Sequence, residues 1–178
     1  MTRRIKVDLN ELEIALNWRS PESSYHLDLE TGRVVMVGDE TRRTLEDLIE
    51  EMYDAEGNQL ISLEELLQQR EDIQDWFKEV LLEADQVDRE YGRRYISIEP
   101  DDPYQDYNDM DWFIATVDDA RLQDRLWRAI RGRGAFRRFK DLIARYPDVQ
   151  AQWYAYTDAQ AKERLLHWLE AHDIEPIA

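Results

Sequence analysis

At 178 residues, the chain has the length of one domain or of a tightly joined pair. Hydrophobic residues make up 43% and aromatic residues 11%, so the chain can bury a core, which excludes a disordered acidic tail. Its 40 acidic and 23 basic residues give a net charge of −17. That charge opposes general attraction to anionic membranes and gives no support to nucleic-acid binding.

The sequence contains no cysteine, which excludes disulfides, thiolate zinc sites and cysteine nucleophiles and suits a reducing compartment. Its first residues include basic side chains but no apolar signal segment. No stretch approaches the roughly 18 consecutive apolar residues of a membrane span. We therefore expect a cytoplasmic protein without a membrane partner.

The first half of the chain alternates between helical and strand patterns. Asp8 begins a predicted helix, and alternating polar and apolar residues near 24–37, with a turn at Gly32, predict a β-hairpin. Residues 39–53 carry apolar side chains at helical spacing. The alternation in residues 94–99 predicts a third antiparallel strand beside the hairpin, and residues 62–91 fit one long helix or two shorter ones.

The second half is helical in pattern. Predicted helices begin at Asp102 and Asp118, the latter running through Arg131, and a third covers 135–146 and stops at Pro147. A short aromatic segment around 153–156 then precedes a last helix capped by Thr157, and the tail could add an edge strand. The fold class is therefore α+β: a helix-rich single domain with a small antiparallel sheet. Residues 1–99 could form an α/β part packed on a helical part, 100–178.

Basic residues concentrate between positions 121 and 140, which we call the basic segment. It holds eight arginine or lysine residues and one acidic residue, Asp124. The helical wheel places these cations outside the apolar stripes, and a helix starting near Gly134 would point free N–H groups at a neighbouring anion. The candidate anion-binding residues are Arg128, Arg131, Arg133, Gly134, Arg137, Arg138 and Lys140.

A structural role competes with that hypothesis. Residues 99–119 carry eight carboxylates and no lysine or arginine, so adjacent helices of opposite charge could simply pair. The segment is not a P-loop, because it lacks a Gly-Lys-Ser/Thr ending and follows a predicted helix. The three histidines have no metal-ligand spacing. We predict no catalytic residue, no metal site and no cofactor.

Three stretches carry a family resemblance: Tyr25-His-Leu-Asp-Leu-Glu-Thr-Gly-Arg-Val-Val, Arg94-Tyr-Ile-Ser-Ile-Glu-Pro and Gly132-Arg-Gly-Ala-Phe-Arg-Arg-Phe-Lys-Asp. With Trp153-Tyr154 and Trp168-Leu169, they resemble a bacterial uncharacterised protein family of the UPF class. The resemblance spans about residues 8 to 176 and supports one domain. It implies no activity, cofactor or catalytic residue.

Three functional hypotheses follow. The leading one is a non-enzymatic interaction or regulatory module in which residues 128–140 of the basic segment contact an anionic group of a ligand or a protein. The alternatives are an enzyme acting on a small phosphorylated or acidic substrate, and an acidic surface that binds a basic partner. The spacing from Leu63 to Tyr91 leaves a helix-mediated homodimer open.

Overall fold

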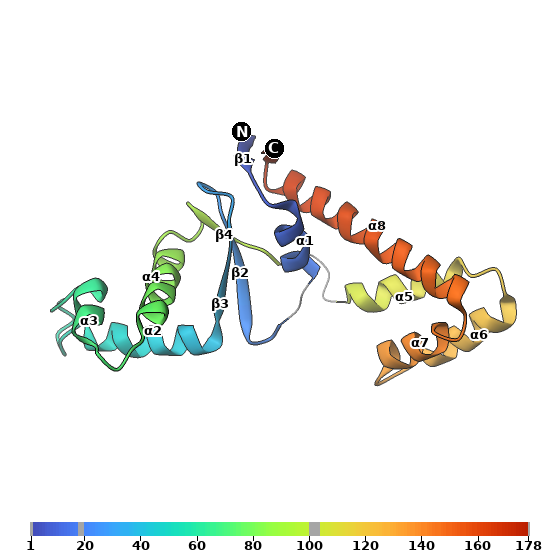
Figure 1. Ribbon diagram of the computed structural model, residues 1–178, viewed down its shortest axis with the longest axis horizontal. Helices are drawn as coiled ribbons and strands as arrows, with labels where there is room; N and C mark the ends of the chain where they lie inside the picture. Colours follow the sequence, from blue (N-terminus) through green and yellow to red (C-terminus); the bar gives the residue numbers. More distant parts are fainter. Residues whose placement is uncertain (1, 18–19, 100–103, 178) are drawn as a thin grey trace. The chain divides into compact units, whose positions relative to one another are not determined.

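The computed structural model describes residues 2–17, 20–99 and 104–177 (Figure 1). The chain divides into two compact units. Unit 1 comprises residues 1–99 and 169–178, and unit 2 comprises residues 100–168. Helices predominate in the described residues, and the strands form one three-stranded and one two-stranded sheet, so the predicted helix-rich α+β class is confirmed.

The larger sheet of unit 1 is antiparallel, with the order β3-β2-β4. The predicted hairpin forms β2 (Ser23–Asp28) and β3 (Val34–Gly38), and the predicted third strand is β4 (Tyr95–Ser97). Tyr25 lies opposite Met36, and His26 lies opposite both Val35 and Ser97. Because side chains alternate between the two faces of a strand, this register puts Val35 and Val37 on the same face as His26.

Four helices belong to unit 1: α1 (Leu9–Asn17), α2 (Asp39–Glu51), α3 (Leu63–Gln69) and α4 (Asp75–Arg89). The Asp8 carboxylate accepts hydrogen bonds from the first amides of α1, as predicted. Ser62 and Glu65 form a reciprocal capping box at the start of α3. Residues 62–91 thus form two helices, since α3 ends at Gln69 and Gln74 precedes α4.

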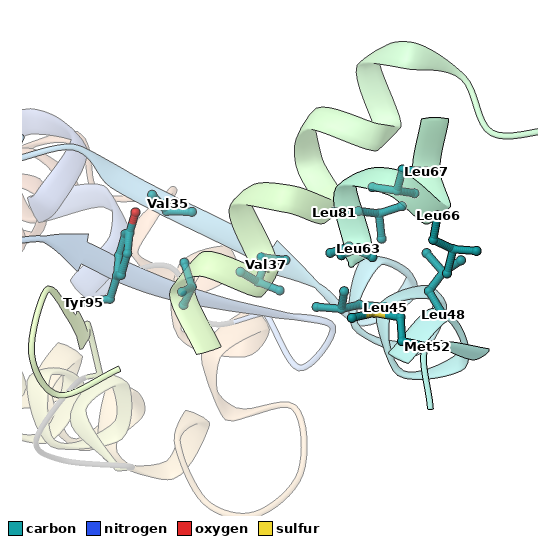
Figure 2. Packing of buried hydrophobic residues seen from close by; sticks show 12 residues of the cluster. Val35, Val37, Leu45, Leu48, Met52, Leu63, Leu66, Leu67, Leu81 and Tyr95 are labelled. Atoms are coloured by element: carbon teal, nitrogen blue, oxygen red, sulfur yellow. The ribbon is translucent and has the colours of Figure 1, made fainter. Parts of the chain in front are cut away.

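The core of unit 1 lies between the sheet and helices α2, α3 and α4 (Figure 2). Val35 and Val37 of β3 point into it, together with leucines of the three helices. Leu63 and Leu81 are fully buried. Burying one leucine side chain is worth roughly 1.5–3 kcal/mol, so this cluster fixes the helices on that face of the sheet.

A second sheet of two parallel strands pairs β1 (Arg3–Lys6) with β5 (Ile174–Ile177). The tail strand was predicted, but β1 was not. Its sequence Arg-Arg-Ile-Lys has one apolar residue and therefore no alternating pattern. The pairing runs from Arg3 opposite Ile174 to Lys6 opposite Ile177.

Unit 2 contains α5 (Gln105–Ala115), α6 (Ala120–Ala129), α7 (Ala135–Ile143) and most of α8 (Pro147–Ala171). The helix start predicted at Asp102 lies outside the described residues. Asp119, and not Asp118, caps α6, which ends two residues before the predicted Arg131. None of the helices in the described ranges has the length and apolar character needed to cross a membrane.

The prediction of a separate last helix capped by Thr157 was wrong, because α8 continues through it for 25 residues. Pro147 occupies the first position of α8, where its missing N–H costs no hydrogen bond. The Thr157 hydroxyl donates to the carbonyl of Tyr154 inside the helix. Of the aromatic residues in the predicted short segment, Trp153 is buried in the core of unit 2 and Tyr156 packs against it, whereas Tyr154 is exposed.

Three aromatic rings form the centre of that core. The Phe139 ring lies 4.7 Å from the Trp153 ring and 6.2 Å from the Phe113 ring, both edge-on. Phe139 is fully buried, and Phe113 and Trp153 are nearly so. This cluster joins α5, α7 and α8, so it fixes α7, the helix that carries the end of the basic segment.

One buried histidine makes the stability of unit 1 depend on pH. His26 Nε2 lies 3.0 Å from Ser24 Oγ, and its Nδ1 has no hydrogen-bond partner among the described residues. Burial, assisted by the charge of Arg42, lowers the pKa of His26 despite the opposing charges of Asp88 and Glu99. The unfolded chain therefore takes up a proton at a higher pH than the folded chain.

We accordingly expect the His26 contribution to stability to be complete above about pH 6.5 and to be lost as the pH falls below that value. The check is urea unfolding between pH 8 and 5 on wild type and His26→Gln. The fall in free energy of unfolding with decreasing pH should be shallower in the variant. Equal pH dependence in both proteins would contradict the assignment.

Candidate anion-binding site

The basic segment occupies α6, α7 and the turn between them. Arg128 lies in the last turn of α6, and Arg131 and Arg133 lie in the connecting turn. Arg137 and Lys140 lie on α7. All five side chains are exposed, on two consecutive helices and the turn that joins them.

The pattern of burial explains why the cations face solvent. Leu122, Leu126 and Ile130 are buried on one side of α6, and Phe139 and Ile143 are buried on one side of α7. Both helices are strongly amphipathic, because their arginines occupy the opposite sides. Packing of the apolar stripes therefore orients the charges outward.

The turn depends on two glycines in the left-handed region. Gly132 and Gly134 both have φ of +74°, a conformation that favours glycine. Gly134 is the N-cap of α7 and has no side chain to cap the helix. A Cβ at position 134 would lie 3.3 Å from the Arg138 guanidinium, so that side chain also limits what fits there.

Arg138 holds the turn together from within. Its guanidinium donates to the carbonyl of Ala129 at 2.8 Å, to that of Arg131 at 2.6 Å, and to that of Arg133. These three carbonyls are the ones that would otherwise repel an anion near the end of α6. Of the predicted site residues, Arg138 thus organises the turn, and three of its five N–H donors are already engaged there.

The start of α7 presents amide donors. The Arg138 amide donates to the Gly134 carbonyl, which closes the first turn of the helix. The preceding amides of Ala135, Phe136 and Arg137 have no acceptor among the described residues. Free N–H groups at a helix start, together with the helix dipole, favour a negative group.

The remaining cations have few partners. Arg137 lies 3.9 Å from Asp141 in an exposed pair, and Lys140 lies over the exposed Phe136 ring at 5.5 Å. Exposed pairs of this kind contribute little, typically below about 1 kcal/mol. No carboxylate of the described ranges forms an ion pair with Arg128, Arg131 or Arg133.

The competing structural role is therefore not seen in the described part of residues 99–119. There, Asp109 is buried and pairs with Arg164 of α8, and Asp119 accepts hydrogen bonds from the first amides of α6. Neither neutralises the arginines of the basic segment. The sequence could not assign these partners, because pairing of side chains from distant helices leaves no periodic signal.

Two pockets are lined by residues of unit 1. One, of about 580 Å³, is lined mainly by carboxylates of α3 and α4: Glu64, Glu79, Glu83, Asp85 and Glu90, with Leu82, Gln86 and Arg89. Burial raises the pKa of Asp85, and Arg89, 2.8 Å away, opposes that shift. The other pocket, of about 730 Å³, has Arg3, Arg4 and His172 in its lining. Residues of the basic segment line neither.

The fold is that of a helix-rich α+β protein, and its acidic chain carries exposed cations on α6, α7 and the turn between them. The chain belongs to the uncharacterised protein family UPF0158, whose model matches residues 83–178. A UPF0158 protein of Pseudomonas aeruginosa is 26% identical over 176 residues, which are 99% of this chain and 89% of that relative. No solved structure matches the chain.

Proposed function

We propose that the protein is a non-enzymatic interaction or regulatory module whose basic segment contacts an anionic group of a ligand or partner. One observation carries the proposal: Arg128, Arg131 and Arg133 are exposed and lack a carboxylate partner among the described residues. These three arginines lack a carboxylate partner even though the chain has a net charge of −17 and acidic side chains are plentiful.

The negative net charge of the chain does not prevent an anion from binding at the basic segment. At physiological ionic strength, charges further apart than about 8 Å are largely screened in water. An anion at the turn would therefore respond mainly to the nearby guanidinium groups and the amides of Ala135 and Phe136. Arg138 supports this by occupying the carbonyls of the same turn, so that the surface displays donors.

Phosphate, sulfate or carboxylate groups suit such donors. Arginine forms short bidentate hydrogen bonds with these anions, and helix amides add directed donors. Binding is favoured over catalysis because the donors lie on exposed residues, and because the two pockets described above have other linings. The enzyme alternative needs an enclosed site with an acid or base beside the cations.

The test compares two charge reversals in binding of inorganic phosphate, measured by isothermal titration calorimetry at physiological ionic strength. Arg133→Glu alters the proposed site, whereas Arg43→Glu alters an exposed arginine of α2 and changes the net charge by the same amount. A charge-assisted hydrogen bond is worth about 1.5–3 kcal/mol, so Arg133→Glu should raise the dissociation constant at least about tenfold.

Arg43→Glu should leave the dissociation constant within about twofold of wild type, since Arg43 is not part of the basic segment and salt screens the effect of net charge alone. The Arg133 side chain makes no contact that holds the turn, because Arg138 uses only its backbone carbonyl. Equal weakening by the two reversals would show that phosphate senses only the net charge, and would contradict the proposal.

A further inference from the structure

The outer edge of β3 has unpaired backbone groups. The ladder between β2 and β3 continues from Asp28, whose amide donates to the Arg33 carbonyl, to Asp39, whose amide donates to the Glu22 carbonyl. Directly bonded pairs alternate with non-bonded pairs in an antiparallel ladder, so Val35 and Val37 bond to β2. Val34 and Met36 form the non-bonded pairs.

The hydrogen bonds between β2 and β4, on the edge of β2 opposite β3, follow the same alternation. The Tyr25 carbonyl, opposite Met36, accepts from the Ile98 amide next to β4 and is therefore turned away from β3. The N–H and C=O groups of Val34 and Met36 must then point outward, away from β2. No hydrogen bond to these outward groups is made by any residue in the described ranges.

In the part of the chain that the structure describes, this edge lacks several of the features that usually prevent strand addition. Natural edge strands are protected by lysine, proline, a bulge or a covering element. The β3 sequence is Val-Val-Met-Val-Gly, without a charge or a proline. Met36, at its centre, is 56% exposed. An exposed apolar edge with free backbone groups favours pairing with another strand.

We propose that β3 pairs antiparallel with β3 of a second copy of this chain, with the two Met36 residues opposite each other on the two-fold axis. The register around Met36 is self-complementary in charge. It places Val34 opposite Gly38, and it places Arg33 opposite Asp39 of the second copy. Both contacts occur twice, as symmetry requires.

The geometry of that pairing suits the side chains. Arg33 directly precedes β3 and Asp39 is the first residue of α2, so this charged pair would lie at the ends of the paired strands, at a position without inter-strand hydrogen bonds. Val35 would face Val37 of the second copy on the sheet face that already carries the core cluster (Figure 2). The present partner of Arg33 is the partly exposed Glu83 at 3.5 Å, a weak contact that leaves the guanidinium able to share a second carboxylate.

The charge pattern distinguishes a second copy from an unrelated peptide. A peptide would supply the backbone groups, but a basic residue opposite Asp39 and an acidic residue opposite Arg33 would be coincidental. This inference is independent of the anion-binding proposal, because β3 belongs to unit 1 and the basic segment belongs to unit 2.

The first test removes only the outward hydrogen bond. Met36→Pro deletes an amide that the internal ladder does not use, and proline is tolerated at edge positions. Analytical ultracentrifugation of the full chain should give about twice the chain mass of 21.4 kDa for wild type and for the control Met36→Leu. It should give the monomer mass for Met36→Pro, with unchanged circular dichroism.

The second test keeps the proposal falsifiable if the proline variant does not fold. Arg33→Glu and Asp39→Arg should each raise the dimer dissociation constant at least about tenfold, because each places like charges opposite each other twice. The double variant should restore the wild-type constant. A monomeric wild type at about 100 µM, or a double variant no tighter than the single ones, would overturn the proposal.

Discussion

Replacing Phe139 by alanine should lower the free energy of unfolding of unit 2 by about 3 to 5 kcal/mol. Phe139 is fully buried between the Trp153 and Phe113 rings, so the substitution leaves a cavity at the centre of three helices. The loss combines the transfer free energy of the ring with the contacts its neighbours no longer make. Urea unfolding followed by tryptophan fluorescence measures it, because Trp153 reports on the same cluster.

Phe136 supplies the matched control on the same helix. Its ring is 47% exposed, so Phe136→Ala should change the free energy of unfolding by less than about 1 kcal/mol. Similar losses from the two substitutions would mean that α7 is not held through the Phe139 side. The comparison therefore tests the orientation of the helix that presents the basic segment.

Asp28→Asn should destabilise unit 1 by about 3 kcal/mol, because it breaks a buried ion pair from one side. The Asp28 carboxylate is 3% exposed and accepts from Arg94 Nε at 3.0 Å and Nη2 at 2.7 Å. It also accepts from the Glu30 amide and the Thr31 hydroxyl, which fixes the hairpin turn. An asparagine keeps the shape but leaves the Arg94 guanidinium partly uncompensated.

The Asp28 interaction also makes the stability of unit 1 depend on pH in the acid range. Burial alone would raise the pKa of Asp28, but the hydrogen bonds from Arg94, Glu30 and Thr31 outweigh it and lower the pKa to about 2. The contribution is therefore present above the unfolded value of 3.8 and is lost as the pH falls toward 2. Acid unfolding of wild type and Asp28→Asn should converge in that range.

Asp54 is the matched control, because its carboxylate also orders a turn but is exposed rather than buried. It accepts from the amides of Glu56 and Asn58 in an exposed loop. Asp54→Asn should cost much less than Asp28→Asn, since the released groups reach water. A loss from Asp28→Asn no larger than this would contradict the role assigned to the buried pair.

Local patterns in the sequence were sufficient for much of the fold. Helices α2 and α7 were predictable because each buries one side, with Leu45 and Leu48 on the first and Phe139 and Ile143 on the second. The hairpin followed from alternation around a glycine turn. By contrast, the apolar residues of α8 do not keep to one side along its 25 residues, so a continuous helix was missed.

Long-range partners were not predictable. Strand β1 exists because β5, more than 160 residues later, pairs with it, and nothing local in its sequence signals a strand. For the candidate site, the local excess of arginine predicted where the exposed cations lie, and the two glycines predicted the turn between the helices. The function of Arg138 as an internal clamp depends on three carbonyls of the preceding turn, which no spacing rule identifies.

The most direct measurement of the anion-binding proposal is a titration of the isotopically labelled chain with inorganic phosphate, followed by amide chemical shifts at constant ionic strength. We predict saturable shifts at the amides of Gly134, Ala135 and Phe136, with a dissociation constant on the order of 1 mM, and their loss in Arg133→Glu. Small shifts spread evenly over the chain, unchanged by Arg133→Glu, would contradict the proposal.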